Sequence, residues 1–307
     1  MLALLAKAAI YRPEAQSLDI GALSQMLERA EVPVLPSHYH RYHFLVKWPS
    51  LTSSHSSDAP LDTIHPCYAQ VLSLPLQMKL MTRAPFPFKA FGLIHIANKI
   101  NVISLPLSNQ TLQLHAYFGR FFSHPKGVVF ELNTDLSVKG ILAVKASSYY
   151  LATNIDSVNK QGLPDFADYK DLQIHFSLKN EKQYDPVQSE QILSFDDSIG
   201  RDYARASGDY NPIHLWPATA KLFGFKRAIA HGMYSKALVL SKVQEQKAIS
   251  LNQGMSLVTV FKRPVLLPSQ AHLQLTEQND GMLFKLSNRQ NKQSSTHMIG
   301  AISKLQS

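Results

Sequence analysis

The chain has 307 residues, of which 45% are hydrophobic and 17% charged, and it contains one cysteine, Cys67. This composition is typical of a globular protein with a sizeable core, and the length allows one large domain or two of about 150 residues. A lone cysteine, which we expect to be an inert core residue, excludes an internal disulfide framework and favours a reducing compartment.

The 31 Lys and Arg residues outnumber the 22 Asp and Glu residues, so the surface should attract anions. The basic residues are scattered, and no zinc-finger, RNA-recognition or basic-helix pattern occurs, so we do not predict nucleic acid as a partner. No stretch approaches the roughly 20 apolar residues that a membrane span needs. We expect a cytoplasmic protein that binds acidic small ligands or acidic partners.

The first predicted element is an apolar helix that begins within Met1–Ile10. Lys7 interrupts its apolar run and no small-residue cleavage region follows, so we do not interpret it as a signal peptide. Further along, His38, His40 and His43 have a spacing that suggests metal ligands. Along a strand, however, His43 would face away from the other two, and no nearby Cys pair or carboxylate completes a set. We therefore predict no metal and no other cofactor.

Two stretches of the chain predict the same order of elements, one long helix followed by four strands. In the first half these are a helix at Pro66–Met81 and strands at Gly92–Leu105, Leu112–Phe122, Val128–Leu136 and Ile141–Leu151. In the second half they are a helix at Gly232–Gln246 and strands at Ser256–Phe261, His272–Thr276, Met282–Leu286 and Thr296–Ser303.

A polar segment with Gly and Pro, Asn154–Lys170, separates the two halves and is typical of a linker. The sequences at the two helix starts are also alike, because Ile64–Ala69 and Ala230–Ser235 share a His and a Tyr at matching positions. We therefore predict an internal repeat, with an N-terminal unit at residues 1–160 and a C-terminal unit at residues 161–307.

The segment Tyr203–His214 concentrates an acid, an amide and an imidazole beside Gly208 and Pro212. Asn211 followed by Pro212 predicts a turn and a helix start, because Asn caps free N–H groups and Pro is favoured at the first helical position. A bend here brings Asp209 and His214 to one pocket wall, where the pair can move protons to and from water. Asp and Asn before Pro are also common turn formers, which is the alternative, purely structural interpretation.

The longer run resembles the hydratase-2 motif of MaoC-like (R)-specific enoyl-CoA hydratases and dehydratases. The matching residues are Tyr203, Ser207, Gly208, Asp209, Asn211, Pro212, Ile213, His214 and Ala218. In the first half, Pro75–Met78, Phe86–Phe88 and Gly92–Asn98 resemble the first repeat of tandem members of this family. The resemblance implies an α+β protein with a double hot-dog fold, in which each unit wraps a curved antiparallel sheet around a central helix.

The resemblance implies (R)-specific hydration of trans-2-enoyl thioesters, or the reverse dehydration, on coenzyme A or acyl carrier protein. We assign Asp209 and His214 jointly to the reactive water, and Asn211 to fixing the turn. Backbone N–H groups at a helix start stabilise a developing oxyanion, and the resemblance places this contact at Gly232. His231 is either a third catalytic imidazole or, as we prefer, a ring bonded to the backbone. Met233, Lys262, Arg263 and His95 are the other predicted substrate contacts.

We expect one active site per chain, because Pro66 stands where the C-terminal unit has Gly232, and proline has no N–H to donate. A hot-dog thioesterase is the first alternative, but the predicted central helix carries only Glu245, near its far end. A non-catalytic acyl-thioester binding module is the second, and the complete set of motif residues argues against it. Assembly into a homodimer stays open.

Overall fold

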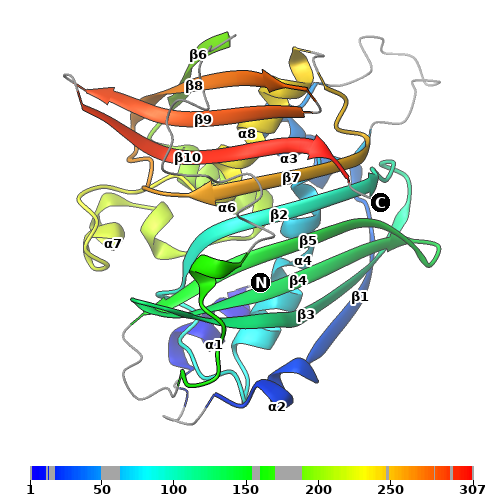
Figure 1. The fold of residues 1–307 in the computed structure, drawn as a ribbon, viewed down its shortest axis with the longest axis vertical. Coiled ribbons are helices and arrows are strands. Elements are labelled where there is room, and N and C mark those ends of the chain that lie inside the picture. The colour runs from blue at the N-terminus through cyan, green and yellow to red at the C-terminus, as the bar shows by residue number, and fades with distance from the viewer. Residues whose placement is uncertain are drawn as a thin grey trace.

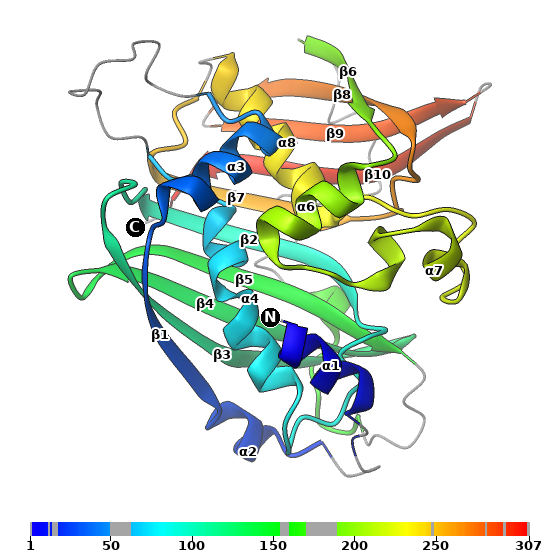
Figure 2. The same cartoon turned by 180° about the vertical axis from the view of Figure 1, so that it is seen from behind.

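One antiparallel sheet runs through both halves of the protein, and its main helices lie against a single face. The computed structural model describes residues 2–11, 13, 18–49, 63–153, 160–169, 189–246, 249–279, 281–290 and 293–305. The 10-stranded sheet lies in front of the helices in Figure 1, and Figure 2 shows the helices in front of the sheet. This is the α+β architecture that the sequence predicts.

The elements have the following bounds. The strands are β1 Leu27–Pro33, β2 Ile94–Ser104, β3 Thr111–His124, β4 Gly127–Val138, β5 Ile141–Thr153, β6 Ser189–Phe195, β7 Gln253–Phe261, β8 Ser269–Gln278, β9 Gly281–Gln290 and β10 Gln293–Lys304. The helices are α1 Leu2–Ile10, α2 Ile20–Ser24, α3 Pro36–Val46, α4 Tyr68–Met81, α6 Ile199–Ser207, α7 Pro217–Lys221 and α8 Gly232–Glu245, with 3-10 turns η1 Phe166–Asp168 and η3 Pro212–His214.

The two halves of the sheet have the same strand order. The order across the sheet is β1-β3-β4-β5-β2-β7-β10-β9-β8-β6, so each half places its first strand at an outer edge and its second strand at the centre. Each half also has one central helix of 14 residues, α4 or α8, immediately before its second strand. The boundary between residues 160 and 161 stays a prediction, because residues 154–159 lie outside the described part.

The central helices are stable because they lie inside the core. Residues 233–241 of α8 are all buried, and a helix that is apolar around most of its circumference is stable only inside a core. The helices and strands predicted from the sequence are present in the structure, with ends that differ by a few residues.

Among the helices that the structure describes, none has the length and apolar character of a membrane span.

The sequence analysis missed both outer strands, β1 and β6. Neither has a run of buried side chains: only two of the seven β6 residues, Leu193 and Phe195, are buried, and β1 has none. Edge strands carry charges and face solvent, so they lack the alternating apolar pattern that predicts a strand. Helix α6 was also missed, since its sequence was interpreted only for its motif residues.

His38, His40 and His43 lie on a helix rather than along a strand. They lie on α3, which begins with Pro36 at a favoured first helical position. The Nδ1 atom of His38 is hydrogen-bonded to the Tyr68 hydroxyl, and His43 Nε2 accepts from the His65 N–H at 3.1 Å. The side chains of His38 and His43 thus meet different partners on the segment that leads into α4.

The described part of the predicted linker packs against the sheet. Residues 160–169 contain η1, and the N–H of Ser123 on β3 donates to the Pro164 carbonyl at 2.8 Å. Phe166 and Tyr169 pack beside Phe122 and Tyr149 in a second, smaller apolar cluster. This segment therefore covers sheet residues as well as connecting the two halves.

The two halves join where β2 pairs with β7, and a buried lysine cross-links these strands. Lys236 on α8 is 0% exposed, and its ammonium donates to the Asn98 carbonyl at 3.2 Å, the Asn98 Oδ1 at 2.6 Å and the Leu257 carbonyl at 3.0 Å. Burial lowers the pKa of Lys236 to about 8, so the side chain remains charged at pH 7. The ammonium therefore satisfies three acceptors at the junction.

Replacing Lys236 by Met should destabilise the protein, because it leaves these acceptors without their donor. A buried unsatisfied group costs about 1–3 kcal/mol, so we expect the free energy of unfolding to fall by about 2–5 kcal/mol in urea denaturation. Lys242→Met, which removes an ion pair with the half-exposed Glu245, should cost less than about 1 kcal/mol. Equal losses in both variants would contradict a special role for Lys236.

Candidate active site

The motif segment bends because its own side chains satisfy the backbone. Helix α6 ends at Ser207 and is capped by Gly208, whose φ of 78° is a left-handed conformation that glycine adopts without strain. The N–H of Asp209 then donates to the Ser207 hydroxyl at 3.2 Å, and the N–H of Asn211 donates to Asp209 Oδ1 at 3.2 Å. Asn211 caps η3 through the N–H of Ile213, as the sequence predicts.

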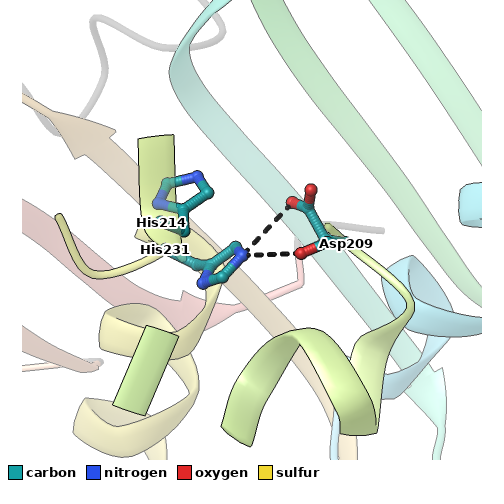
Figure 3. Close-up of side chains that lie close together, drawn as sticks. All are labelled: Asp209, His214 and His231. Carbon is teal, nitrogen blue, oxygen red and sulfur yellow. Dashed lines mark hydrogen bonds and ion pairs between the residues drawn. The ribbon is translucent and has the colours of Figure 1, made fainter. Parts of the chain in front are cut away.

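This bend brings Asp209, His214 and His231 together (Figure 3). The rings of His214 and His231 stack with centroids 3.7 Å apart. His231 Nε2 lies 2.9 Å from the backbone carbonyl of Asp209 and 3.9 Å from its Oδ2 atom. The preferred interpretation of His231, a ring bonded to the backbone, agrees with this contact, although the functional roles stay predictions.

Backbone carbonyls define the tautomer of each imidazole, because a carbonyl oxygen only accepts. His214 Nδ1 lies 2.8 Å from the Ile229 carbonyl, so Nδ1 carries the proton and Nε2 keeps its lone pair. His231 Nε2 donates to the Asp209 carbonyl, and its buried Nδ1 has no hydrogen-bond partner in the described chain. His214 therefore offers an unprotonated nitrogen as an acceptor.

Burial keeps both rings neutral. It lowers the pKa of His214 to about 3, helped by His231 and opposed by Asp209 and the Ile229 carbonyl. It also lowers the pKa of His231 to about 3, opposed by the bond to the Asp209 carbonyl. The Asp209 side chain is 38% exposed, whereas that of His231 is 2% exposed. A solvated carboxylate thus lies beside two desolvated neutral imidazoles.

A cavity of about 560 Å³ opens onto these groups and has walls from both halves of the chain. Leu74, Met78 and Met81 of α4 contribute apolar side chains from the first half. Every predicted site residue also lines it: Asp209, Asn211, His214, Gly232, His231, Met233, Lys262, Arg263 and His95. The structure therefore collects the predicted residues around one space, which is large enough for part of a small-molecule ligand.

Gly232 begins α8 at the wall of this cavity, and no side chain caps the helix start. A Cβ atom built there would lie 3.1 Å from the Phe261 ring, so glycine permits the close approach of that ring. Backbone N–H groups of a first helical turn lack intrahelical partners and lie at the positive end of the helix dipole. This wall is suited to an oxygen that gains negative charge.

His95 reaches the cavity from β2. Its ring stacks on Tyr150 with centroids 4.6 Å apart and lies 5.0 Å from that of Phe261. Burial lowers the pKa of His95 to about 3, and its Nε2 atom is buried without a hydrogen-bond partner among the described residues. Partial desolvation lowers the pKa of the Lys262 ammonium.

Sequence reasoning missed Tyr150 and Ile229. Tyr150 lies in a predicted strand, but nothing in the alternation of that strand distinguishes a cavity-lining ring from a core ring. Ile229 acts through its backbone carbonyl, which leaves no side-chain signal at all. Only the folded chain brings these two groups to His95 and His214.

The N-terminal unit has a corresponding position that is filled by an indole. Helix α3 is capped by Lys47 in the left-handed conformation and Trp48 follows, just as α6 is capped by Gly208 and Asp209 follows. The Trp48 ring lies 4.5 Å from that of His65, and these residues are 7% and 1% exposed. Trp48 thus corresponds to Asp209, and His65 corresponds to His231.

Asp209, His214 and His231 could in principle share a metal ion, since one donor atom of each lies within 4.8 Å of the others. His231 Nε2, however, carries the proton donated to the Asp209 carbonyl, so coordination through that atom would break this hydrogen bond. The absence of a metal stays a prediction.

Comparison with known proteins identifies relatives of the chain. Residues 180–298 match the family described as MaoC like domain. The 3-hydroxyacyl-thioester dehydratase X of Mycobacterium tuberculosis is 29% identical over 221 residues, which cover 72% of this chain and 72% of that protein.

Solved structures give the same result for the fold. The crystal structure of HtdX of Mycobacterium tuberculosis has a TM-score of 0.70 at 24% identity, over 91% of this chain and 100% of that one. A second protein of this organism, described as having a double hotdogfold, has a TM-score of 0.57 at 11% identity, over 91% of this chain and 95% of that one. The predicted double hot-dog fold is confirmed.

The tautomers and pKa values predict the behaviour of the two stacked imidazoles in NMR. In two-bond ¹H–¹⁵N spectra, His214 should carry its proton on Nδ1 and His231 on Nε2, and both should stay neutral from pH 8 to about 4. Titration of either ring near its ordinary pKa of about 6.5 would contradict the desolvated site. Loss of the His231 Nε2 proton would indicate a metal ligand instead.

Proposed function

We propose that the protein is a hydro-lyase that acts on acyl thioesters, because residues 180–298 match the family described as MaoC like domain. It adds water to trans-2-enoyl thioesters and removes water from (3R)-hydroxyacyl thioesters. One observation carries the proposal: Asp209 and the unprotonated Nε2 of His214 border the same cavity as the uncapped start of α8. These groups supply proton transfer and oxyanion stabilisation at a single place.

Hydration begins with a water molecule held between Asp209 and His214 Nε2. The water oxygen bonds to the β-carbon while Asp209 and His214 together accept a proton from the water, with Asp209 as the principal acceptor. The π electrons of the C=C bond move toward the thioester. The two side chains then deliver a proton to the α-carbon. H and OH of one water are added overall, and dehydration follows the same steps in reverse.

The thioester carbonyl gains negative charge during this step, and the Gly232 N–H stabilises it. A donor held by the backbone needs no reorganisation when the charge develops, which makes such contacts effective. Asn211 keeps Asp209 in place, since its N–H donates to Oδ1. His231 also positions Asp209, because its Nε2 donates to the Asp209 backbone carbonyl.

We infer one active site per chain. In the N-terminal unit Trp48 replaces the carboxylate, and Pro66 replaces the glycine whose N–H would bind the oxyanion. That unit instead contributes cavity wall from α4, β2 and β5. The acyl chain, on coenzyme A or an acyl carrier protein, is the proposed substrate, with Met233, Lys262, Arg263 and His95 as further contacts. A cytoplasmic location and a homodimer stay predictions.

The thioesterase alternative lacks support in the central helix. Hydrolysis needs water directed at the carbonyl, with a carboxylate placed on or near this helix. The one carboxylate on α8 is Glu245, whose side chain is 58% exposed and paired with Lys242 at 2.5 Å. Assays should therefore detect hydration without release of free thiol.

Removing either proton-transfer group should abolish most of the activity. We expect Asp209→Asn and His214→Gln each to lower kcat by about a hundredfold or more, measured as loss of enoyl-thioester absorbance. Asp202→Asn, on the surface of α6, is the control and should retain activity. An (S) product from the wild type, or full activity of Asp209→Asn, would contradict the mechanism.

Two substitutions at Gly232 distinguish the effect of losing the backbone N–H from the effect of adding side-chain bulk. Gly232→Ala crowds Phe261 but keeps the N–H, whereas Gly232→Pro also removes it, at a first helical position that tolerates proline. We expect the Pro variant to have a kcat at least about tenfold below that of the Ala variant, with both folded by circular dichroism. Equal values for the two variants would exclude the N–H as the oxyanion donor.

A further inference from the structure

An exposed apolar and basic segment, residues 216–227, projects from the body of the protein beside the active site. We call it the lip. It contains α7, which stands out from the side of the molecule in Figures 1 and 2. Trp216, Leu222 and Phe223 are 53%, 83% and 44% exposed. Large apolar side chains gathered in one exposed segment are a feature of interaction surfaces.

The lip forms part of the cavity wall. Phe223 and Phe225 line the cavity together with Lys262 and Arg263, although Phe223 is also exposed. Whatever binds the outer side of the lip therefore lies next to the opening through which a thioester reaches Asp209. The lip is suited to the part of the substrate that stays outside the cavity.

This region of the chain is almost free of acidic residues. From Tyr210 to Thr276 the sequence has a single acid, Glu245, and that side chain is already paired with Lys242. The basic residues at the lip and the mouth are Lys221, Lys226, Arg227, Lys262 and Arg263. Within the part of the chain that the structure describes, these five make no ion pair with a carboxylate. The surface is therefore complementary to an acidic partner.

Trp216 is held in place before any partner arrives. The Arg201 guanidinium lies over its ring, 4.1 Å from the centroid, and Arg201 Nη1 also donates to the carbonyls of Asp197 and Leu215 at 3.2 Å each. Tryptophan and arginine dominate the energetics of protein interfaces, and a fixed side chain loses little entropy on binding. A hydrogen-bonded guanidinium over the indole opposes insertion of this ring into a lipid bilayer.

We propose that the lip docks an acidic carrier protein that holds the acyl chain as a thioester. The inference rests on the proposed function and names the partner that delivers the substrate. The phosphates of coenzyme A would use the cations but leave Trp216 and Leu222 exposed. A second copy of this chain would bring the same basic patch against itself in a two-fold dimer, which like charges oppose.

The test compares one trans-2-enoyl group on an acidic acyl carrier protein, on coenzyme A and on pantetheine alone. The variants are Lys221→Glu/Lys226→Glu and, separately, Leu222→Asp, none of which lines the cavity. Lys139→Glu/Lys145→Glu makes the same change in net charge at the β4–β5 hairpin and is the matched control. Calorimetry with the acyl carrier measures binding independently of turnover.

Each lip variant should lower kcat/KM for the carrier substrate by about tenfold or more, mainly through KM, and should weaken carrier binding equally. Turnover of the pantetheine thioester should stay within about twofold, and the control should match the wild type. Unchanged carrier binding in the lip variants would overturn the docking surface. Equal losses on pantetheine would overturn it too, because they indicate a structural role.

Two further outcomes separate the docking surface from the chemistry. Lip-dependent binding to vesicles of anionic phospholipid, without an effect on the carrier, would assign the lip to a membrane surface instead and overturn the proposal. A wild type that hydrates none of the three thioesters would refute the proposed function, while the calorimetric comparison would still decide whether the lip binds the carrier.

Discussion

The pairing of β2 with β7 is the constraint on which the rest of this structure depends. It joins two five-stranded halves into one sheet and brings both central helices to the same face. Lys236 extends from α8 to this junction and donates to Asn98 on β2 and to Leu257 on β7. A buried ammonium is unfavourable unless its N–H donors are satisfied. Because the three acceptors of Lys236 lie on β2 and β7, the position of α8 is linked to the register in which these two strands pair. The cavity between the halves exists because this junction is fixed.

Desolvation and backbone carbonyls together prepare the chemistry of the site. The His214 and His231 rings are stacked and largely buried, which keeps them neutral, and each donates its proton to a main-chain oxygen. The position of the Ile229 carbonyl thus determines that the proton of His214 is on Nδ1 and that Nε2 is unprotonated. Asp209 stays partly solvated, so acid and imidazole side chains a few residues apart have different environments. Because of this contrast, one short segment holds two different proton acceptors, the Asp209 carboxylate and the neutral Nε2 of His214.

The two halves show how one backbone plan supports different chemistry. In each, a helix ends in a left-handed residue, the next side chain approaches a histidine, and a central helix follows. Where the C-terminal half has Asp209 and Gly232, the N-terminal half has Trp48 and Pro66. An indole fills space and proline removes a donor, so the N-terminal half retains the shape without the proton-transfer groups. Side chains from α4, β2 and β5 of the N-terminal half instead line the cavity at the active site of the C-terminal half.

The central helices, the inner strands and the residues of the motif could be predicted from the amino-acid sequence. Buried elements have apolar periodicity, and the turn at Asn211 and Pro212 is encoded by local capping. The sequence did not reveal β1 and β6, because edge strands lack that periodicity. It also did not predict the helix that carries His38 to His43, because a short polar segment has no decisive period. The folded chain alone shows which carbonyls meet His214 and His231, that Trp48 corresponds to Asp209, and that His95 and Tyr150 of the first half line the cavity beside the second-half residues. Those contacts join residues far apart in the chain, and their geometry depends on the β2–β7 junction, which no local pattern encodes.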